Sequence, residues 1–337
     1  MIVVLKPKIS KREEQAVLKE IKKLGYMPHV MRGVARTVIG AIGDERANQS
    51  LEALMTWPQV ENVMPVQKRY KLVSREAHPA NSTIGVGKHT IGGPKFHVMA
   101  GPCSVESEKQ LLKTASAVAA AGATILRGGA FKPRTSPYEF QGLGEKGLKL
   151  LDKARRETGL AIITELLSET QADLVAEYSD ILQIGARNAQ NYQLLIAAAR
   201  TGKPVLLKRG LSMRIEEWLL AGEYVLANDN CNLMFCERGI RTFETYTRNT
   251  LDLSTIPIVK NESHLPVVID PSQGVGRSDL VIAMCKGAVA MGADALLIEV
   301  HPNPAEAWSD GAQQVSLDSF KRLMSELKPF LAAAGRE

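Results

Sequence analysis

The sequence predicts an α/β protein whose larger part is a (β/α)8 barrel, a TIM barrel, preceded by a small domain. Eight short runs of mostly apolar residues are separated by stretches with helical patterning. Runs that are apolar on both faces are typical of buried parallel strands, and eight strand–helix units close into a barrel. The runs are KFHVMA at 95–100, ATIL at 123–126, AIIT at 161–164, ILQIG at 181–185, PVLL at 204–207, NLMFC at 232–236, PVVI at 266–269 and ALLI at 295–298.

A charged or potentially metal-binding side chain follows each of these runs. In a barrel of this kind, the C-terminal strand ends meet at one mouth, where active sites lie. Cations gathered around candidate metal ligands are typical of a site for a phosphorylated, anionic substrate. In chain order the residues are Cys103, Arg127, Glu165, Arg187, Lys208, Glu237 with Arg238, Asp270 and Glu299.

Helices are expected between the strands, and the barrel is expected to occupy residues 95–337. Apolar residues recur with helical spacing in seven stretches, which is the main sequence signal for an amphipathic helix. These stretches are 106–121, 144–158, 170–177, 188–199, 215–227, 279–291 and 317–331.

Residues 1–70 have the pattern of a separate βαββαβ domain. A first strand, IVVLK, is followed by Ser10 and Glu13, which have the spacing of a helix capping box. Two hairpin strands, a short helix at 48–55 and a last strand complete the ferredoxin-like order. The domain contains no cluster of candidate catalytic groups, so it is expected to bind a regulatory ligand or a second subunit. Residues 71–94 are expected to be a linker and a glycine-turn hairpin, TIGVGKHTIGG, that closes the bottom of the barrel.

The composition excludes several classes of protein. The net charge of +6 comes without a basic run or an aromatic-interleaved basic patch, so no nucleic-acid partner is expected. No apolar stretch reaches 18 residues and the N-terminus lacks the order of a signal peptide, so no membrane span is expected. Four cysteines in 337 residues do not form a disulfide framework, which favours a reduced, cytoplasmic setting.

The segment RGGAFKPRTSP is the densest group of candidate ligand-binding residues. Two glycines allow the backbone to come close to a ligand, and arginine forks and hydroxyls bind phosphate. A solvated loop is the alternative interpretation. The candidates are Arg127, Lys132, Arg134, Thr135 and Ser136.

Three further residues have the donor atoms of a mixed sulfur and oxygen metal site. Cys103 follows the first strand and Glu299 ends the last, so the two lie on adjacent strands if the barrel closes. Asp310, in a Ser-Asp-Gly turn, is a candidate third ligand. A buried thiol and plain turn chemistry are the alternatives for Cys103 and Asp310. Glu165 and Glu237 either hold the cations in place or act in acid–base chemistry.

The motifs together resemble one family over nearly the whole chain. They are AGPCS, LRGGAFKPRTSPYEFQGLGEKGL, QIGARN, PVLLKRG, CERGIRTFE, SHLPVVIDPS, and EVHP with SDG. The sequence resembles 3-deoxy-D-arabino-heptulosonate 7-phosphate (DAHP) synthases of type I beta, the form with an N-terminal ferredoxin-like domain. The resemblance implies an aldol-type condensation of phosphoenolpyruvate with erythrose 4-phosphate that gives DAHP and phosphate, the first step of the shikimate pathway. It also implies a homo-oligomer, a tetramer or a dimer, and an aromatic amino-acid effector on the N-terminal domain.

The resemblance also implies a role for each candidate residue. Phosphoenolpyruvate would be held by Arg127, Lys132, Arg187, Lys208 and Arg238. The aldose phosphate would be held by Arg134, Thr135 and Ser136. A divalent metal such as Mn or Mg would be bound by Cys103, Glu299 and Asp310, with the position of Gln273 completing the set. Catalytic roles are expected for Lys132, Asp270 and Glu165.

Residue 273 departs from the family pattern, because the histidine expected after Asp-Pro-Ser is Gln273 here. Three outcomes are open: the amide oxygen is a weaker, harder ligand, or His301 replaces the missing histidine, or the metal is lost. A catalytically impaired paralogue that binds phosphoenolpyruvate is therefore one alternative function. The related eight-carbon synthase, 3-deoxy-octulosonate 8-phosphate synthase, which uses arabinose 5-phosphate, is the other.

Overall fold

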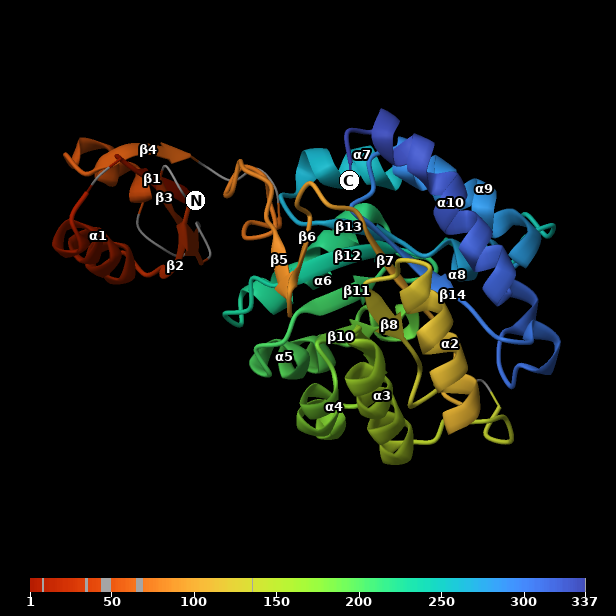
Figure 1. Ribbon diagram of the computed structural model, residues 1–337. Helices are drawn as coiled ribbons and strands as arrows, with labels where there is room; N and C mark the ends of the chain where they lie inside the picture. The colour runs from red at the N-terminus through yellow and green to blue at the C-terminus, as the bar shows by residue number, and fades with distance from the viewer. Residues whose placement is uncertain (8, 34–35, 44–49, 65–68, 135, 337) are drawn as a thin grey trace. The chain divides into compact units, whose positions relative to one another are not determined.

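The structure is a computed structural model that describes residues 1–7, 9–33, 36–43, 50–64, 69–134 and 136–336. It divides into two compact units (Figure 1). The first comprises residues 1–81 with 261–264, and the second comprises residues 82–260 with 265–337.

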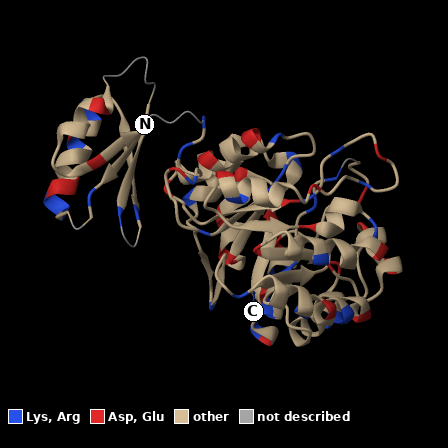
Figure 2. Cartoon of the chain, turned by 90° about the horizontal axis from the view of Figure 1, so that it is seen from above, with Lys and Arg blue, Asp and Glu red and all other residues tan. Residues whose placement is uncertain are grey.

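The N-terminal unit has the expected ferredoxin-like fold. A four-stranded antiparallel sheet has the order β2-β3-β1-β4. Its elements are β1 (Ile2–Leu5), α1 (Lys11–Lys23), β2 (Met27–Arg32), β3 (Thr37–Ile42), the 3-10 helix η1 (Leu51–Thr56) and β4 (Val60–Met64). Ser10 and Glu13 form the predicted capping box at the start of α1, and Val17 and Ile21 are buried on one face of this helix. Charged positions are prominent on α1, whereas the strands of this unit are mainly uncharged (Figure 2).

The short helix expected at 48–55 differs from the prediction. Residues 48 and 49 lie outside the described part of the chain, and the helix that follows is a 3-10 helix, Leu51–Thr56. Ser50 caps it by accepting a hydrogen bond from the backbone N–H of Glu52 at 3.2 Å. Leu51 and Leu54 are buried at a spacing of three, which suits the three residues per turn of a 3-10 helix.

The second unit contains a closed barrel of eight parallel strands, as predicted. The strands are β7 (His97–Gly101), β8 (Ile125–Arg127), β9 (Ala161–Leu166), β10 (Ile181–Ile184), β11 (Val205–Lys208), β12 (Leu233–Glu237), β13 (Val267–Ile269) and β14 (Ala295–Glu299). The barrel closes between the last strand and the first, with Glu299 opposite Gly101.

Helices surround the barrel (Figure 1). They are α2 (Glu108–Ala120), α3 (Glu145–Thr158), α4 (Ala172–Tyr178), α5 (Tyr192–Arg200), α6 (Ile215–Leu226), α7 (Thr255–Glu262), α8 (Pro271–Val275), α9 (Ser278–Ala290) and α10 (Leu317–Ala333). The sequence did not reveal α7 or α8. In the described part of the chain, no helix has the length and apolar composition needed to cross a lipid bilayer.

A small hairpin contributes apolar side chains to the core inside the barrel. Strands β5 (Ile84–Val86) and β6 (His89–Ile91) pair antiparallel. Their apolar side chains pack in one cluster with residues from all eight barrel strands. The cluster comprises Ile84, Val86, Ile91, Met99, Ile125, Ile163, Ile181, Leu206, Met234, Cys236, Val268, Ala295 and Leu297. The interior is therefore a packed core, and a ligand can bind only beyond its end.

Candidate active site

The strand pleat determines which side chains face the mouth of the barrel. Alternate residues of a strand point the same way, so the residue two positions after a core residue faces inward one layer higher. Ile125 in the core is thus followed by Arg127, and Leu206 is followed by Lys208. The same rule gives Glu165, Gln183, Arg238, Asp270 and Glu299 on the other strands.

Five of these residues, and the loops beyond them, line a cavity of about 290 Å³, whereas Asp270 and Glu299 do not line it. The lining is Arg127, Lys132, Pro133, Arg134, Glu139, Glu165, Gln183, Gly185, Ala186, Arg187, Lys208, Arg238, Arg248, Gln273 and Asp310. Most of the predicted site residues are therefore brought together. Ser136 does not line the cavity, and its hydroxyl accepts a hydrogen bond from the N–H of Tyr138 at 3.3 Å. Thr135 lies outside the described residues.

Two buried ion pairs hold cations at the base of the cavity. Arg127 Nη1 lies 2.8 Å from Glu299 Oε1, and Lys208 Nζ lies 2.5 Å from Asp270 Oδ2. Nε of Arg127 is buried and has no hydrogen-bond partner among the described residues. Because a buried N–H without a partner is costly, this atom is a donor available to a ligand.

Lys132 reaches the cavity from the loop after β8. Its ammonium group lies 3.1 Å from Cys103 Sγ and donates to the Cys103 carbonyl oxygen at 3.2 Å. Arg134, two residues further on, pairs with Glu139 at 2.7 Å. Lys132 is thus held against Cys103, whereas Arg134 is held by Glu139.

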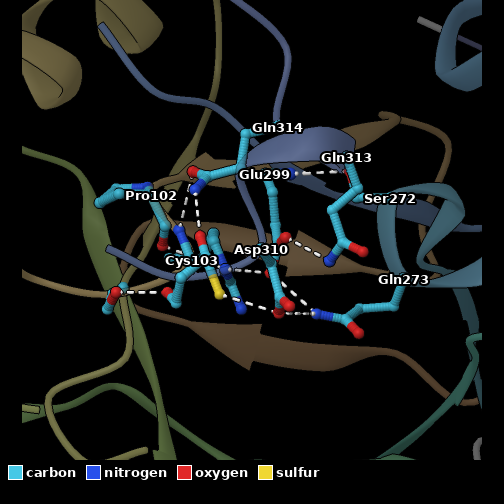
Figure 3. A network of polar contacts seen from close by, with 12 residues as sticks. Pro102, Cys103, Ser272, Gln273, Glu299, Asp310, Gln313 and Gln314 are labelled. Carbon is cyan, nitrogen blue, oxygen red and sulfur yellow. Dashed lines mark hydrogen bonds and ion pairs between the residues drawn. The ribbon is translucent and has the colours of Figure 1, made fainter. Parts of the chain in front are cut away.

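Cys103, Glu299 and Asp310 form a group with metal-binding potential, shown in Figure 3. One donor atom from each lies within 4.8 Å of the others. Burial, with the negative charge of Glu299 nearby, raises the pKa of the Cys103 thiol to about 12, so the thiol is protonated at neutral pH. Burial alone would raise the pKa of Asp310, but the positive charges of Arg248 and Lys132 outweigh it and lower the pKa to about 2. A divalent cation binds the thiolate form of cysteine, so its binding would release the Cys103 proton. As one thiolate and two carboxylates, these three residues fit a divalent cation.

Gln273 approaches the same group with its amide nitrogen. Nε2 donates to Glu299 Oε1 at 3.0 Å and to Asp310 Oδ2 at 3.3 Å, while Oε1 accepts from Arg238 Nη2 at 2.9 Å. The amide oxygen is thus on the side away from the two carboxylates.

His301 does not replace the missing histidine. Strand β14 ends at Glu299, and the His301 ring lies 3.2 Å from Glu106 Oε2 and 2.7 Å from the Asn303 carbonyl oxygen. The strand pleat does not continue far enough to direct this ring to Cys103, Glu299 and Asp310.

Glu237 forms an ion pair with a cation other than those expected at the mouth of the barrel. It pairs with Arg209 at 2.9 Å, and Arg209 also contacts Asp252 at 3.1 Å. Arg209 is itself buried, and it does not line the cavity. The Glu237 ion pair therefore stabilises the loop after β11.

Gln183 and Arg248 are two of the cavity residues that the sequence did not indicate. Gln183 is a buried polar residue within the apolar run of β10. Its position two residues after Ile181 could have predicted that it faces the mouth of the barrel. Arg248 lies in the loop after β12 and contacts Asp310 at 3.2 Å and Gln313 at 2.9 Å. Its distance from any strand end left no signal in the sequence.

Comparison with known proteins agrees with this geometry. The DAHP synthetase I family matches residues 73–332, and the DAHP synthase ferredoxin-like domain matches residues 1–68. Phospho-2-dehydro-3-deoxyheptonate aldolase of Thermotoga maritima is 50% identical over 99% of both chains. A crystal structure of that aldolase superposes with a TM-score of 0.80 at 48% identity and covers 100% of this chain and 98% of that one.

A more distant group of relatives shares the barrel. The 2-dehydro-3-deoxyphosphooctonate aldolase of Syntrophotalea carbinolica is 33% identical and covers 73% of this chain and 94% of its own. One family assignment follows from the cavity, the cations that line its mouth and the matches over both units. This chain belongs to the DAHP synthetase I family and carries that family's N-terminal ferredoxin-like domain.

Proposed function

We propose that this chain condenses phosphoenolpyruvate with erythrose 4-phosphate to give DAHP and phosphate, the first step of the shikimate pathway. One observation supports this most strongly. Six predicted cations line a single cavity beside the possible metal ligands Cys103, Glu299 and Asp310. The cations are Arg127, Lys132, Arg134, Arg187, Lys208 and Arg238. Two phosphates and a carboxylate need such a charge excess.

The cations divide between the two substrates. Arg127, Lys132, Arg187, Lys208 and Arg238 are proposed to bind phosphoenolpyruvate, whose phosphate and carboxylate suit arginine forks. Arg134, with Thr135 and Ser136, is proposed to bind the aldose phosphate near the rim. Carbon 3 of the enol then forms a bond to the aldehyde carbon, water adds at carbon 2, and phosphate leaves with cleavage of its bond to that carbon.

Two residues are proposed to transfer protons in this reaction, and a third is proposed to position a cation. Lys132, a cation at the cavity wall, donates a proton to the oxygen of the former aldehyde. The carboxylate of Glu165 accepts the proton released by the water that adds at carbon 2. Asp270 keeps the ammonium group of Lys208 directed into the cavity through their 2.5 Å contact.

A divalent cation such as Mn or Mg is proposed to bind Cys103, Glu299 and Asp310. When bound there, it supplies Lewis-acid polarisation of the aldehyde oxygen. The protein residues hold the two carboxylates in position, because Arg127 and Gln313 contact Glu299 at 2.8 and 2.6 Å. Arg248 does the same for Asp310.

A product assay tests the proposed reaction. Purified protein with both substrates and Mn²⁺ should release phosphate and form the seven-carbon product in equal amounts. Absence of product with every divalent metal tried would overturn the proposal. Replacement of erythrose 4-phosphate by arabinose 5-phosphate tests the eight-carbon alternative. That alternative is not favoured, because the octonate relative is only 33% identical and covers 73% of this chain.

We also propose residues 1–70 as a regulatory domain, 71–94 as linker and hairpin, and 95–337 as the catalytic barrel. A groove between α1 and β2, lined in part by Leu18, Lys22 and Val30, supports the binding of an amino-acid effector to the regulatory domain.

A homo-oligomer, a dimer or a tetramer, is proposed from family membership. The four unpaired cysteines agree with a cytoplasmic setting.

A further inference from the structure

The amide of Gln273 is held in one orientation by groups from three other parts of the barrel. Its oxygen accepts a hydrogen bond from Arg238 Nη2 at 2.9 Å. Its nitrogen donates to Glu299 Oε1 at 3.0 Å and to Asp310 Oδ2 at 3.3 Å. The backbone is fixed as well, because the N–H of Gln273 donates to Asp270 Oδ1 at 2.9 Å at the start of α8.

The opposite orientation of this amide is disfavoured on both sides. It would place the NH2 group against the guanidinium of Arg238, which has donors only and cannot be deprotonated in a protein. It would also place the amide oxygen against two carboxylate oxygens. Neither contact could form a hydrogen bond, so the surrounding charges determine which end of the amide faces Glu299 and Asp310.

This orientation affects cation binding at Cys103, Glu299 and Asp310. The amide hydrogens point at carboxylate oxygens whose lone pairs a divalent cation would need. They also carry partial positive charge, which repels a cation placed between the same carboxylates. For the amide oxygen to become a ligand, the side chain would have to rotate and lose its contact with Arg238.

We propose that Gln273 is an internal competitor of the divalent cation and is not one of its ligands. The cation then binds through three protein ligands, and its binding displaces the amide nitrogen from Glu299 and Asp310. Because cation binding breaks these two hydrogen bonds, removing the amide should tighten cation binding about 5- to 30-fold. A ligand role for the amide oxygen predicts the opposite sign.

The test measures Mn²⁺ binding to the full chain in the absence of substrates. The electron paramagnetic resonance signal of free Mn²⁺ reports how much of the ion remains unbound. Gln273→Leu removes both the donor and any ligand atom, and it should lower the dissociation constant about 5- to 30-fold. Gln273→Met, whose side chain is closer in shape to glutamine and has no affinity for a hard cation, should lower the dissociation constant in the same way. It provides a second test in case the leucine variant does not fold. Exposed Gln190→Leu is the matched control and should leave binding unchanged.

Weaker or unchanged Mn²⁺ binding in both folded position-273 variants would overturn the inference. The inference rests on the proposed function only in taking Cys103, Glu299 and Asp310 as the cation site. The two fail differently, because the binding measurement uses no substrate. Tighter Mn²⁺ binding without any condensation product would count against the function alone. Product formation with weaker Mn²⁺ binding in the variants would count against the inference alone.

Discussion

Arg187 differs from the other cations at the base of the cavity because its side chain is exposed. It lies in the 3-10 helix η3 (Ala186–Asn188) after β10, where an exposed guanidinium can meet an incoming anion. We expect Arg187→Ala to raise the KM for phosphoenolpyruvate about 10- to 100-fold, the value of one hydrogen-bonded charge pair. Thermal stability should change little, since exposed substitutions stay within about 0.5 kcal/mol.

Steady-state kinetics would check this, with exposed Arg200→Ala on α5 as the matched control. The control should keep the wild-type KM. Equal KM values for Arg187→Ala and wild type would remove Arg187 from the substrate site.

Arg209 should behave in the opposite way, although it is adjacent to Lys208 in the sequence. It is buried against Glu237 and donates to Thr255 at 2.9 Å. Arg209→Met leaves a buried carboxylate without its partner, so we expect the free energy of unfolding to fall by about 3–5 kcal/mol. The KM values should change far less than the stability.

Urea denaturation of the single variant and of Arg209→Met/Glu237→Leu would check this. The double variant should recover part of the loss, because no unpaired buried charge remains. A raised KM with unchanged stability would show instead that Arg209 acts on the substrate.

The sequence identified six of the cavity cations. Arg127, Lys208 and Arg238 follow buried strand residues with the two-residue period, whereas Lys132, Arg134 and Arg187 lie in the segments beyond the strands. The buried ion pair of Arg209 with Glu237 was not predicted, because it forms only when β11 and β12 lie side by side. The orientation of Gln273 was also beyond prediction. It depends on Arg238, Glu299 and Asp310, which meet only in the closed barrel.

The hairpin of β5 and β6 contributes three apolar side chains to the barrel core. Ile91 is fully buried in the core cluster, whereas Gly85 on the facing strand is exposed, and a methyl group added there would meet only open space. We expect Ile91→Ala to lower the free energy of unfolding by about 2–5 kcal/mol, the usual cost of a large cavity. Gly85→Ala is the control and should be nearly neutral in the same urea titration. Equal stability of the two variants would show that the hairpin does not support the barrel.

His97 at the start of β7 should make stability depend on pH. Its ring lies 3.1 Å from both the Thr124 hydroxyl and the Thr90 carbonyl oxygen, and burial lowers its pKa to about 4. The unfolded chain, with a pKa near 6.5, binds the proton more tightly. The stability contribution is therefore complete above about pH 6.5 and is lost as the pH falls toward 4.

Unfolding free energies of wild type and His97→Gln between pH 7 and pH 4 would check this. Wild type should lose about 2 kcal/mol more than the variant over this range, after allowance for partial solvent screening of the ring. Parallel curves for the two proteins would contradict the assignment.

The elements that the sequence missed have physical explanations. Helix α7 is short and contains Pro257 in its first turn, which hides the helical period. Helix α8 has only five residues and forms because Asp270 caps it and Pro271 suits its first position. The type of helix η1 could not be predicted, because a capping serine followed by two leucines three residues apart fits both an α-helix and a 3-10 helix. Long strand–helix units were predictable because each carries its own periodic signal.

For the molecule as a whole, the two units have separate cores. The N-terminal core is built from residues between Met1 and Val63, and the barrel core from residues between Ile84 and Leu297. We therefore expect a chain lacking residues 1–70 to fold and to keep its basal condensation rate.

The same truncated chain should lose any inhibition by aromatic amino acids that the full chain shows. Initial rates of both forms, measured with and without phenylalanine or tyrosine, would check this. Inhibition that persists after truncation would place the effector site in the barrel.

The proposed reaction requires that one rim of the barrel binds phosphoenolpyruvate next to a divalent cation. A crystal structure of the full chain with phosphoenolpyruvate and Mn²⁺ tests it most directly. We predict the ligand's phosphate and carboxylate on Arg127, Arg187, Lys208 and Arg238, with Mn²⁺ on Cys103, Glu299 and Asp310. Phosphoenolpyruvate bound away from this cavity, or Mn²⁺ bound to other residues, would contradict the account.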